Sequence, residues 1–283
     1  REDARKVKLF AALLFPALLM TVFVGVRFES VILEKAETAG YSSVGEYHIK
    51  DGTKILANYA FYGCEKLSSV SIPDSVTAIG ECAFGSCNRL VSVNLPGNVL
   101  SIGEYAFGSC INLAAVTLSE GVTSIGEGAF TSSFINSITI PDSVTSVAYN
   151  AFSGCTSLES ITIPDSVTSI GDCTFYDCDS LTSITIGNGV TSIGSSAFSY
   201  CSSLTSITIP YGVTWIRERT FLSCSSLTNI TIPKSVTSIG NFTFQECAML
   251  TEVTIPESVT AIGDNAFSLC TSLTKIKIPN SVT

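Results

Sequence analysis

Apolar and polar residues recur along most of the chain in one fixed pattern. The stretch from Leu158 to Cys178, LESITIPDSVTSIGDCTFYDC, returns almost unchanged at Leu181 to Cys201 and at Leu204 to Cys224. One phenylalanine per unit marks the period: Phe61, Phe84, Phe107, Phe130, Phe152, Phe175, Phe198, Phe221, Phe244 and Phe267. Neighbours in this series are 23 residues apart, except for the 22 residues between Phe130 and Phe152. The pattern therefore predicts an array of about ten small units that bury their apolar faces against one another.

Each unit begins with a predicted β-strand. Ile161 and Ile163 alternate with Ser160 and Thr162, which is the period of a strand with one buried face. Stacking of the units about 4.8 Å apart places these strands in one parallel sheet. A proline without an N–H ends most of them: Pro73, Pro96, Pro141, Pro164, Pro210, Pro233, Pro256 and Pro279.

The rest of the unit is predicted to turn. A second short extended piece, VTSIG, buries Val167 and Ile170, and Gly171 permits a tight bend. The A-F-x-x-C run that follows is too short for a lasting helix, so we expect one helical or 3-10 turn with Phe and Cys inward. The expected fold is a repeat solenoid, mainly β, with a stacked parallel sheet and short helical turns.

The unit reads L-x-x-I-x-I-P-x-x-V-x-x-I-G-x-x-A-F-x-x-C. This 23-residue pattern resembles the BspA-type leucine-rich repeat, and the resemblance runs from Tyr47 to the end of the chain. It implies a leucine-rich-repeat solenoid of the kind found in cell-surface and secreted proteins. It implies no single function, because adhesion, host-binding and structural proteins share the fold.

An uncharged apolar run from Leu9 to Val26 precedes the array. As a helix it would extend roughly 27 Å, enough to cross the hydrocarbon core of a membrane. Arg5, Lys6 and Lys8 precede the run and only Arg27 directly follows it. This bias predicts one N-terminal transmembrane helix, with the repeats on the extracytoplasmic or lumenal side. The alternative is a cleaved secretory signal peptide and a secreted protein.

The expected organisation has four parts. Residues 1–8 form a basic N-terminal segment, 9–27 the anchor or signal peptide, 28–46 a connector and 47–283 the array. The chain stops at Val282 and Thr283, inside a unit, so we expect the array to continue beyond this point.

Composition narrows the function classes. The net charge of −9 and pI near 4.6 argue against binding of nucleic acid, which requires basic residues to neutralise phosphates. Charged residues make up only 14% of the chain, so Ser and Thr must cover much of the surface. The single histidine, His48, lies outside the regular array and leaves little material for acid–base or triad chemistry. We expect no enzyme activity and no cofactor.

The eleven cysteines also follow the period. Nine stand three residues after the repeat phenylalanine: Cys64, Cys87, Cys110, Cys155, Cys178, Cys201, Cys224, Cys247 and Cys270, with Ser133 in the short unit. Free cysteine behaves as a small buried hydrophobe, so a ladder of buried thiols is predicted. Zinc is not expected, because these residues run along a line rather than around a point. Cys82 with Cys87, and Cys173 with Cys178, remain alternative disulfide pairs.

Two surface features are candidates for binding. Outward hydroxyls such as Ser160, Thr162, Thr185 and Thr208 form two files on the exposed sheet face. Threonine suits exposed strand positions, so the files have a structural explanation. The other interpretation is a flat recognition surface for a glycan, an extended peptide or even ice. Acidic residues after the strand are interpreted as solvated turn residues: Asp74, Glu120, Asp142, Asp165 and Glu257.

One unit departs from the pattern. Tyr211 opens it, Trp215 replaces a small exposed Ser, Arg217 replaces the bend Gly, and Arg219 follows. Trp, Tyr and Arg are enriched at binding hot spots. Sporadic drift of a repeat is the competing explanation, but Tyr211, Trp215, Arg217 and Arg219 are the first candidates for a partner site.

Together these features predict a membrane-anchored, non-enzymatic module that binds a protein or glycan partner outside the cytoplasm. The alternative function is a structural subunit of a multi-subunit membrane complex, whose single helix docks among others. A secreted adhesin with a cleaved signal peptide is a further alternative.

Overall fold

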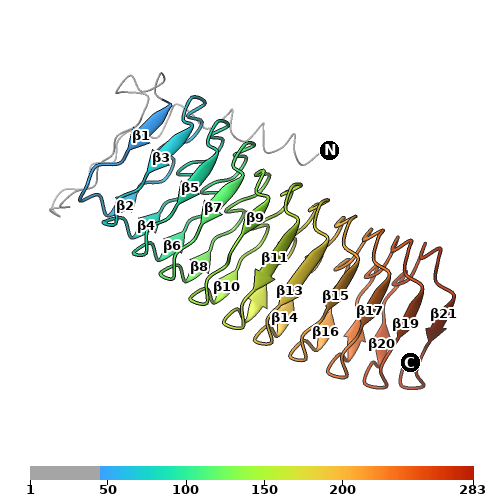
Figure 1. Ribbon diagram of the computed structural model, residues 1–283. Coiled ribbons are helices and arrows are strands. Elements are labelled where there is room, and N and C mark those ends of the chain that lie inside the picture. Colours follow the sequence, from blue (N-terminus) through green and yellow to red (C-terminus); the bar gives the residue numbers. More distant parts are fainter. Residues whose placement is uncertain (1–44) are drawn as a thin grey trace, which may run out of the picture.

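The computed structural model describes residues 45–283 as one continuous solenoid of stacked coils (Figure 1). Each coil contributes a strand to each of two long faces, and all strand pairs are parallel. Within these residues no helix is long and apolar enough to cross a membrane. The predicted anchor from Leu9 to Val26 lies outside the described residues.

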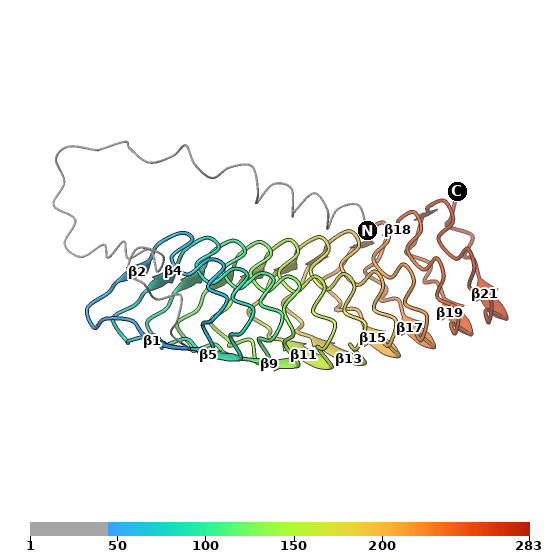
Figure 2. The same ribbon diagram turned by 90° about the horizontal axis from the view of Figure 1, so that it is seen from above.

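The first face, here called the long-strand face, carries the predicted S-I-T-I strands. They are β1 (Glu46–His48), β3 (Ser69–Ser71), β5 (Ser92–Asn94), β7 (Ala115–Thr117), β9 (Ser137–Ile138), β11 (Ser160–Ile163), β13 (Ser183–Ile186), β15 (Ser206–Thr208), β17 (Asn229–Thr231), β19 (Glu252–Thr254) and β21 (Lys275–Lys277). Their isoleucines point inward and their hydroxyls outward, as the alternation predicts. Seen from above, these strands lie along one long edge of the array (Figure 2).

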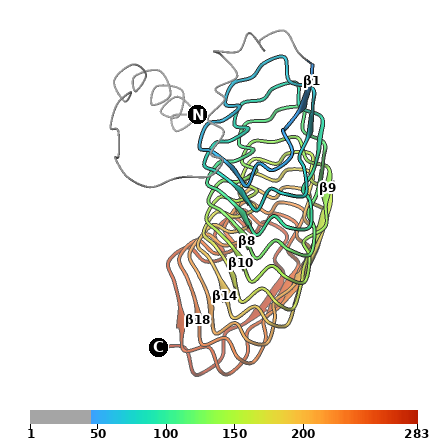
Figure 3. The same cartoon turned by 90° about the vertical axis from the view of Figure 1, so that its left-hand side faces the viewer.

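The second face, the short-strand face, consists of two-residue strands. They are β2 (Ile55–Leu56), β4 (Ala78–Ile79), β6 (Ser101–Ile102), β8 (Ser124–Ile125), β10 (Ser146–Val147), β12 (Ser169–Ile170), β14 (Ser192–Ile193), β16 (Trp215–Ile216), β18 (Ser238–Ile239) and β20 (Ala261–Ile262). The predicted second extended piece therefore forms a ladder of its own. Viewed along the array, the coils fan out instead of superposing, so the solenoid twists (Figure 3).

The prediction of helical turns is wrong for the described residues, which contain turns but no α-helix or 3-10 helix. Cys82 and Ser86 flank Phe84 with φ of 49° and 58°. A right-handed helix cannot pass through two left-handed residues. Instead the N–H of Phe84 donates to the carbonyl of Ala106 in the next coil at 2.8 Å. The turns thus form a third side of the solenoid that is hydrogen-bonded from coil to coil, and we call it the turn side.

The core is a single apolar column. The repeat phenylalanines stack with ring centroids 5.1–5.6 Å apart and interplanar angles of 2–13°. From Phe84 to Phe244 all members of this stack are fully buried. No coil could cover its own phenylalanine, so burial of each depends on both neighbours.

The thiol ladder is confirmed, and it has a hydrogen-bonding role that the sequence did not indicate. The buried Cys155 thiol donates to the carbonyl of Phe130 in the preceding coil at 3.1 Å. Ser133 makes the same bond to Phe107 at 2.6 Å, which explains why serine can replace cysteine there. The same contact recurs from Cys87 to Cys270. Cys82, Cys87, Cys173 and Cys178 are free thiols, so neither alternative disulfide forms.

Candidate functional site

The hydroxyl files lie where the alternation places them. Ser160, Thr162, Thr185 and Thr208 are all exposed on the long-strand face. None of these four hydroxyls is hydrogen-bonded within residues 45–283, so all are open to a partner. Thr162 stands opposite Thr185 in the register of β11 and β13. The long-strand sheet stops at β13, however, and a new one starts at β15. The predicted file is therefore interrupted between Thr185 and Thr208.

An open hollow lies in the long-strand face at the short repeat. Strand β9 pairs with β11 only through Ser137 and Ser160, and this unit has one residue fewer before its strand. A hollow of about 490 Å³ lies over β7, β9 and β11, and its outer lining includes Thr117, Thr139 and Thr162. It offers hydroxyls but no charged group.

Trp215 and Arg217 come together on the short-strand face. Trp215 begins β16, is 45% exposed and lies in register with Ser238 of the next coil. The guanidinium carbon of Arg217 lies 4.6 Å from the centroid of the indole ring, within cation–π distance. These two departures from the repeat therefore form one surface feature.

Arg217 also disturbs the stacking of the coils. A Cβ placed on the equivalent Gly194 or Gly240 would meet backbone of the preceding coil at 2.4 or 2.5 Å. Ala148, also at this position, keeps its bond to the carbonyl of Ile125, although at 3.2 Å. Arg217 lacks the corresponding bond to Ile193, although Gly194 and Gly240 donate theirs at 2.9 and 2.8 Å.

Both sheets are interrupted at the boundary between the coil of β13 and β14 and the coil of β15 and β16. The short-strand sheet ends at β14 and resumes at β16, where the long-strand sheet also breaks between β13 and β15. The turn side continues across the break, since Phe198 donates to the carbonyl of Thr220 at 2.9 Å. We refer to this boundary as the seam. Among residues 45–283 it is the one place where both sheets are broken.

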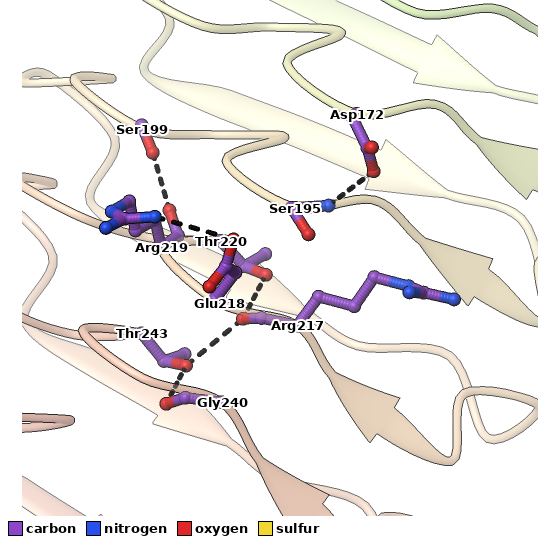
Figure 4. A network of polar contacts seen from close by, with 9 residues as sticks. All are labelled: Asp172, Ser195, Ser199, Arg217, Glu218, Arg219, Thr220, Gly240 and Thr243. Atoms are coloured by element: carbon purple, nitrogen blue, oxygen red, sulfur yellow. Dashed lines mark hydrogen bonds and ion pairs between the residues drawn. The ribbon is translucent and has the colours of Figure 1, made fainter. Parts of the chain in front are cut away.

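Arg219 does not join the Trp215 patch. Figure 4 shows the side chains of Arg217 and Arg219 extending in opposite directions from the chain. Arg219 pairs with Glu218 at 3.4 Å and lies 5.0 Å from the ring centroid of Phe242. Tyr211 is 68% exposed in the turn that precedes β16. The candidate cluster is therefore divided, and Trp215 with Arg217 forms its centre.

Buried threonines hold the backbone of this bend, and sequence reasoning missed them. Thr220 and Thr243 both donate to the carbonyl of Arg217, at 2.7 and 3.1 Å (Figure 4). Thr174 makes the same contact to Ala148 at 3.2 Å. The bends at Ala148 and Arg217 are each followed by a coil in which Thr replaces the Ala before the repeat phenylalanine, whereas the bend at Ala57 is followed by Ala83. The signal in the sequence was the change from A-F to T-F.

A second hollow, of about 430 Å³, lies beside Trp215. Its lining runs across β16, β18 and β20 and the bend after them: Ser195, Trp215, Glu218, Ser238, Ile239, Gly240, Asn241, Ala261, Ile262 and Gly263. It combines one exposed aromatic ring with several polar side chains.

The buried thiols stabilise the fold, and the acidic residues of the turns lie at the surface. Burial raises the pKa of the Cys110 and Cys155 thiols to about 12, so they stay protonated and can donate to backbone carbonyls. The acidic turn residues Asp74, Glu120, Asp142, Asp165 and Glu257 are all exposed, as predicted. Within residues 45–283 no three His, Cys, Asp or Glu side chains gather as metal ligands.

Comparison with known proteins identifies the repeat. The model of the BspA type leucine-rich repeat region matches residues 38–158, 123–236 and 214–283, in six copies. A leucine-rich repeat protein from Bacteroides ovatus is 30% identical, with 86% of this chain and 75% of that chain covered and a TM-score of 0.60. A leucine rich cell surface protein from Faecalibacterium prausnitzii is 33% identical, with 83% and 73% covered and a TM-score of 0.54.

The pneumococcal vaccine antigen PcpA shares the fold at 17% identity, with 84% of this chain and 73% of that chain covered and a TM-score of 0.53. No curated protein matches the chain. The matched repeats extend over the whole described array, so the chain belongs to the BspA-type leucine-rich repeat family.

Proposed function

We propose that this chain is a non-enzymatic binding module, held at the outer side of a membrane by the segment from Leu9 to Val26. Its partner, a protein or a glycan, contacts the patch formed by Trp215 and Arg217. The observation that carries this proposal is the exposure of the single Trp of the chain at a position where neighbouring coils have Ser192 and Ser238.

The scaffold does not require this tryptophan. Ser238 occupies the same register position and its strand pairs normally, so an indole at position 215 adds surface without adding core. Exposed Trp and Arg are the residues that supply most binding energy at hot spots. Arg217 already holds the ring in place, which lowers the entropy that binding must remove.

The location outside the cytoplasm is supported by the charge bias around the apolar run and by the family. Arg5, Lys6 and Lys8 precede the run, while the repeats follow it. The similar protein from Faecalibacterium prausnitzii is described as a cell surface protein. A non-enzymatic role is supported by the similar solved proteins, which are described as a leucine-rich repeat protein and a leucine rich cell surface protein.

A photo-crosslinking experiment on the full chain in its source cells tests the patch. A photoreactive residue replaces Ser238, which lies beside Trp215, and the adduct is compared with and without Trp215→Ser. Restoring the repeat serine should reduce crosslinking at least about tenfold, as loss of a hot-spot aromatic does. The matched control is Arg219→Asn, because Asn150 and Asn265 adopt the same left-handed conformation at this position. Equal adduct with Trp215→Ser would reject the patch.

Membrane attachment is tested separately. Alkaline carbonate should leave the full chain in the membrane pellet, and protease added to intact cells should remove the repeats. Release by carbonate, or protection of the repeats from protease, would refute the proposed topology. Recovery of the chain in a stoichiometric high-mass complex after mild detergent extraction would instead favour the membrane-complex subunit.

A further inference from the structure

The hollow beside Trp215 has a bare floor. We call its floor the strands β18 and β20 with the bend glycines Gly240 and Gly263, where Ser238 and Ala261 contribute only small side chains to the lining. The N–H groups of Gly240 and Gly263 already donate to Ile216 and Ile239, both at 2.8 Å. The floor therefore has no free strand edge for an extended peptide, and it supports a ligand that uses the walls instead.

The polar wall offers both donors and acceptors. The Asn241 side-chain carbonyl accepts the N–H of Asp264 at 2.8 Å, which leaves its amide N–H₂ group free to donate. The Ser195 hydroxyl makes no hydrogen bond within residues 45–283, although its backbone N–H donates to Asp172. The half-exposed Glu218 carboxylate supplies acceptor oxygens. Hydroxyl groups of a ligand can pair with all three of these side chains.

The indole of Trp215 also lines the hollow, and the guanidinium carbon of Arg217 lies 4.6 Å from the centroid of its ring. An aromatic face in water favours a ligand with an apolar C–H surface. Arg219 compensates the Glu218 carboxylate at 3.4 Å, and the Arg217 guanidinium lies against the indole.

We propose that this hollow is a saccharide-binding site. A pyranose ring lays its C–H face on Trp215, receives hydrogen bonds from the Asn241 amide and donates hydroxyl hydrogens to Glu218. The volume of about 430 Å³ lies within the range of small-molecule sites and accommodates a short oligosaccharide. Arg217 acts as a positioning residue that holds the indole. This inference rests on the proposed function, since it names the class of ligand that the patch takes.

The chain provides its own reporter, because Trp215 is its only tryptophan. The full chain in detergent is first applied to an array of neutral oligosaccharides that includes glucans, mannans and N-acetylglucosamine oligomers. The best ligand is then titrated while indole emission is recorded. We expect a saturable change of the emission, and at least a tenfold loss of array binding in Trp215→Ser but only partial loss in Trp215→Phe.

A second variant separates recognition from folding. Asn241→Asp keeps an acceptor for the N–H of Asp264 but removes the donating amide, so affinity should fall severalfold at an unchanged melting temperature. Phe134→Ala serves as the control and should bind normally, because this exposed side chain does not line the hollow. No saturable emission change with any bound saccharide, or equal binding by Trp215→Ser, overturns the inference. Crosslinking that depends on Trp215 while no oligosaccharide binds would refute the saccharide and leave the proposed function intact.

Discussion

Replacing Arg217 with glycine should close the seam. In most other coils a glycine at this bend lets the backbone approach the preceding coil within the distances that a Cβ would forbid. Two backbone bonds have counterparts on either side of the seam but are missing at it: Thr214 to Thr191 and Arg217 to Ile193. With glycine at position 217 both bonds should form, as they do in the coils of Gly194 and Gly240.

The expected gain follows from these two bonds. Each backbone hydrogen bond contributes about 0.5–1.5 kcal/mol net, so the pair contributes about 1–3 kcal/mol. Glycine costs about 0.5–1 kcal/mol in chain entropy relative to alanine. Arg217→Gly should therefore exceed Arg217→Ala in unfolding free energy by about 1 kcal/mol, and both variants lose the contact with Trp215 equally. Alanine should be intermediate between arginine and glycine, as the 3.2 Å bond of Ala148 indicates.

Hydrogen exchange resolved by mass spectrometry is the direct assay. Peptides that cover residues 214–217 should exchange roughly five- to hundredfold more slowly in Arg217→Gly than in the wild type, which corresponds to the free energy of the two bonds. Peptides on the turn side around Phe198 should be unchanged, because that ladder is continuous across the seam. Equally fast exchange at residues 214–217 in both proteins would refute the steric origin of the seam.

Three further predictions concern the core. Phe175→Ala should lower the unfolding free energy by about 3–5 kcal/mol in chemical denaturation, because it leaves a cavity between two stacked rings. Phe134→Ala at the surface is the control and should change this free energy by less than about 0.5 kcal/mol. Similar values for the two variants would contradict the stacked column. The unfolding free energy of Cys155→Ser should stay within about 1 kcal/mol of the wild type, since Ser133 already makes the equivalent hydrogen bond. Cys155→Ala removes the donor and should lower the unfolding free energy by about 1–3 kcal/mol. A larger loss with serine than with alanine would argue against the thiol hydrogen bond. Burial raises the pKa of Cys155 to about 12, whereas a thiol of the unfolded chain has a pKa of about 8.5. The thiol of the unfolded state therefore loses its proton first, and the unfolding free energy should fall as pH rises from about 9 to 12. Denaturation series at several pH values should show this fall with a smaller slope in Cys155→Ser, and an equal slope would count against the cysteine as its source.

Prediction from the sequence was most successful for inward and outward residues. The alternation at Ile161 and Thr162 and the period of the phenylalanines predicted which side chains are buried. In a stack of identical units, equivalent side chains of all units point the same way, either into the core or toward solvent. It failed for the turn after each bend, where a helical turn was expected. Propensity describes a segment alone, whereas the N–H of Phe84 is satisfied by the next coil and the left-handed Cys82 and Ser86 aim it there.

The sequence predicted some features of the candidate site and not others. The replacement of Ser by Trp215 and of Gly by Arg217 is visible in the repeat register, and exposure of the indole follows from that register alone. The sequence does not show that the two arginines belong to different surfaces. Arg217 and Arg219 lie only two residues apart, yet their side chains extend in opposite directions (Figure 4). The polar wall of the hollow also could not be foreseen, since Ser195, Glu218 and Asn241 come from three different coils.

The sequence by itself determined the architecture of this protein, because a repeated unit with one apolar face can be stable only when copies of it cover one another. Only the tertiary structure decided how well each copy fits the one before it. Arg217 is a local change in the sequence, but the bend that it occupies packs closely against the preceding coil. Ala148 is accommodated at the same bend with both sheets intact, whereas both sheets break at the coil of Arg217, and Trp215 stands beside that seam.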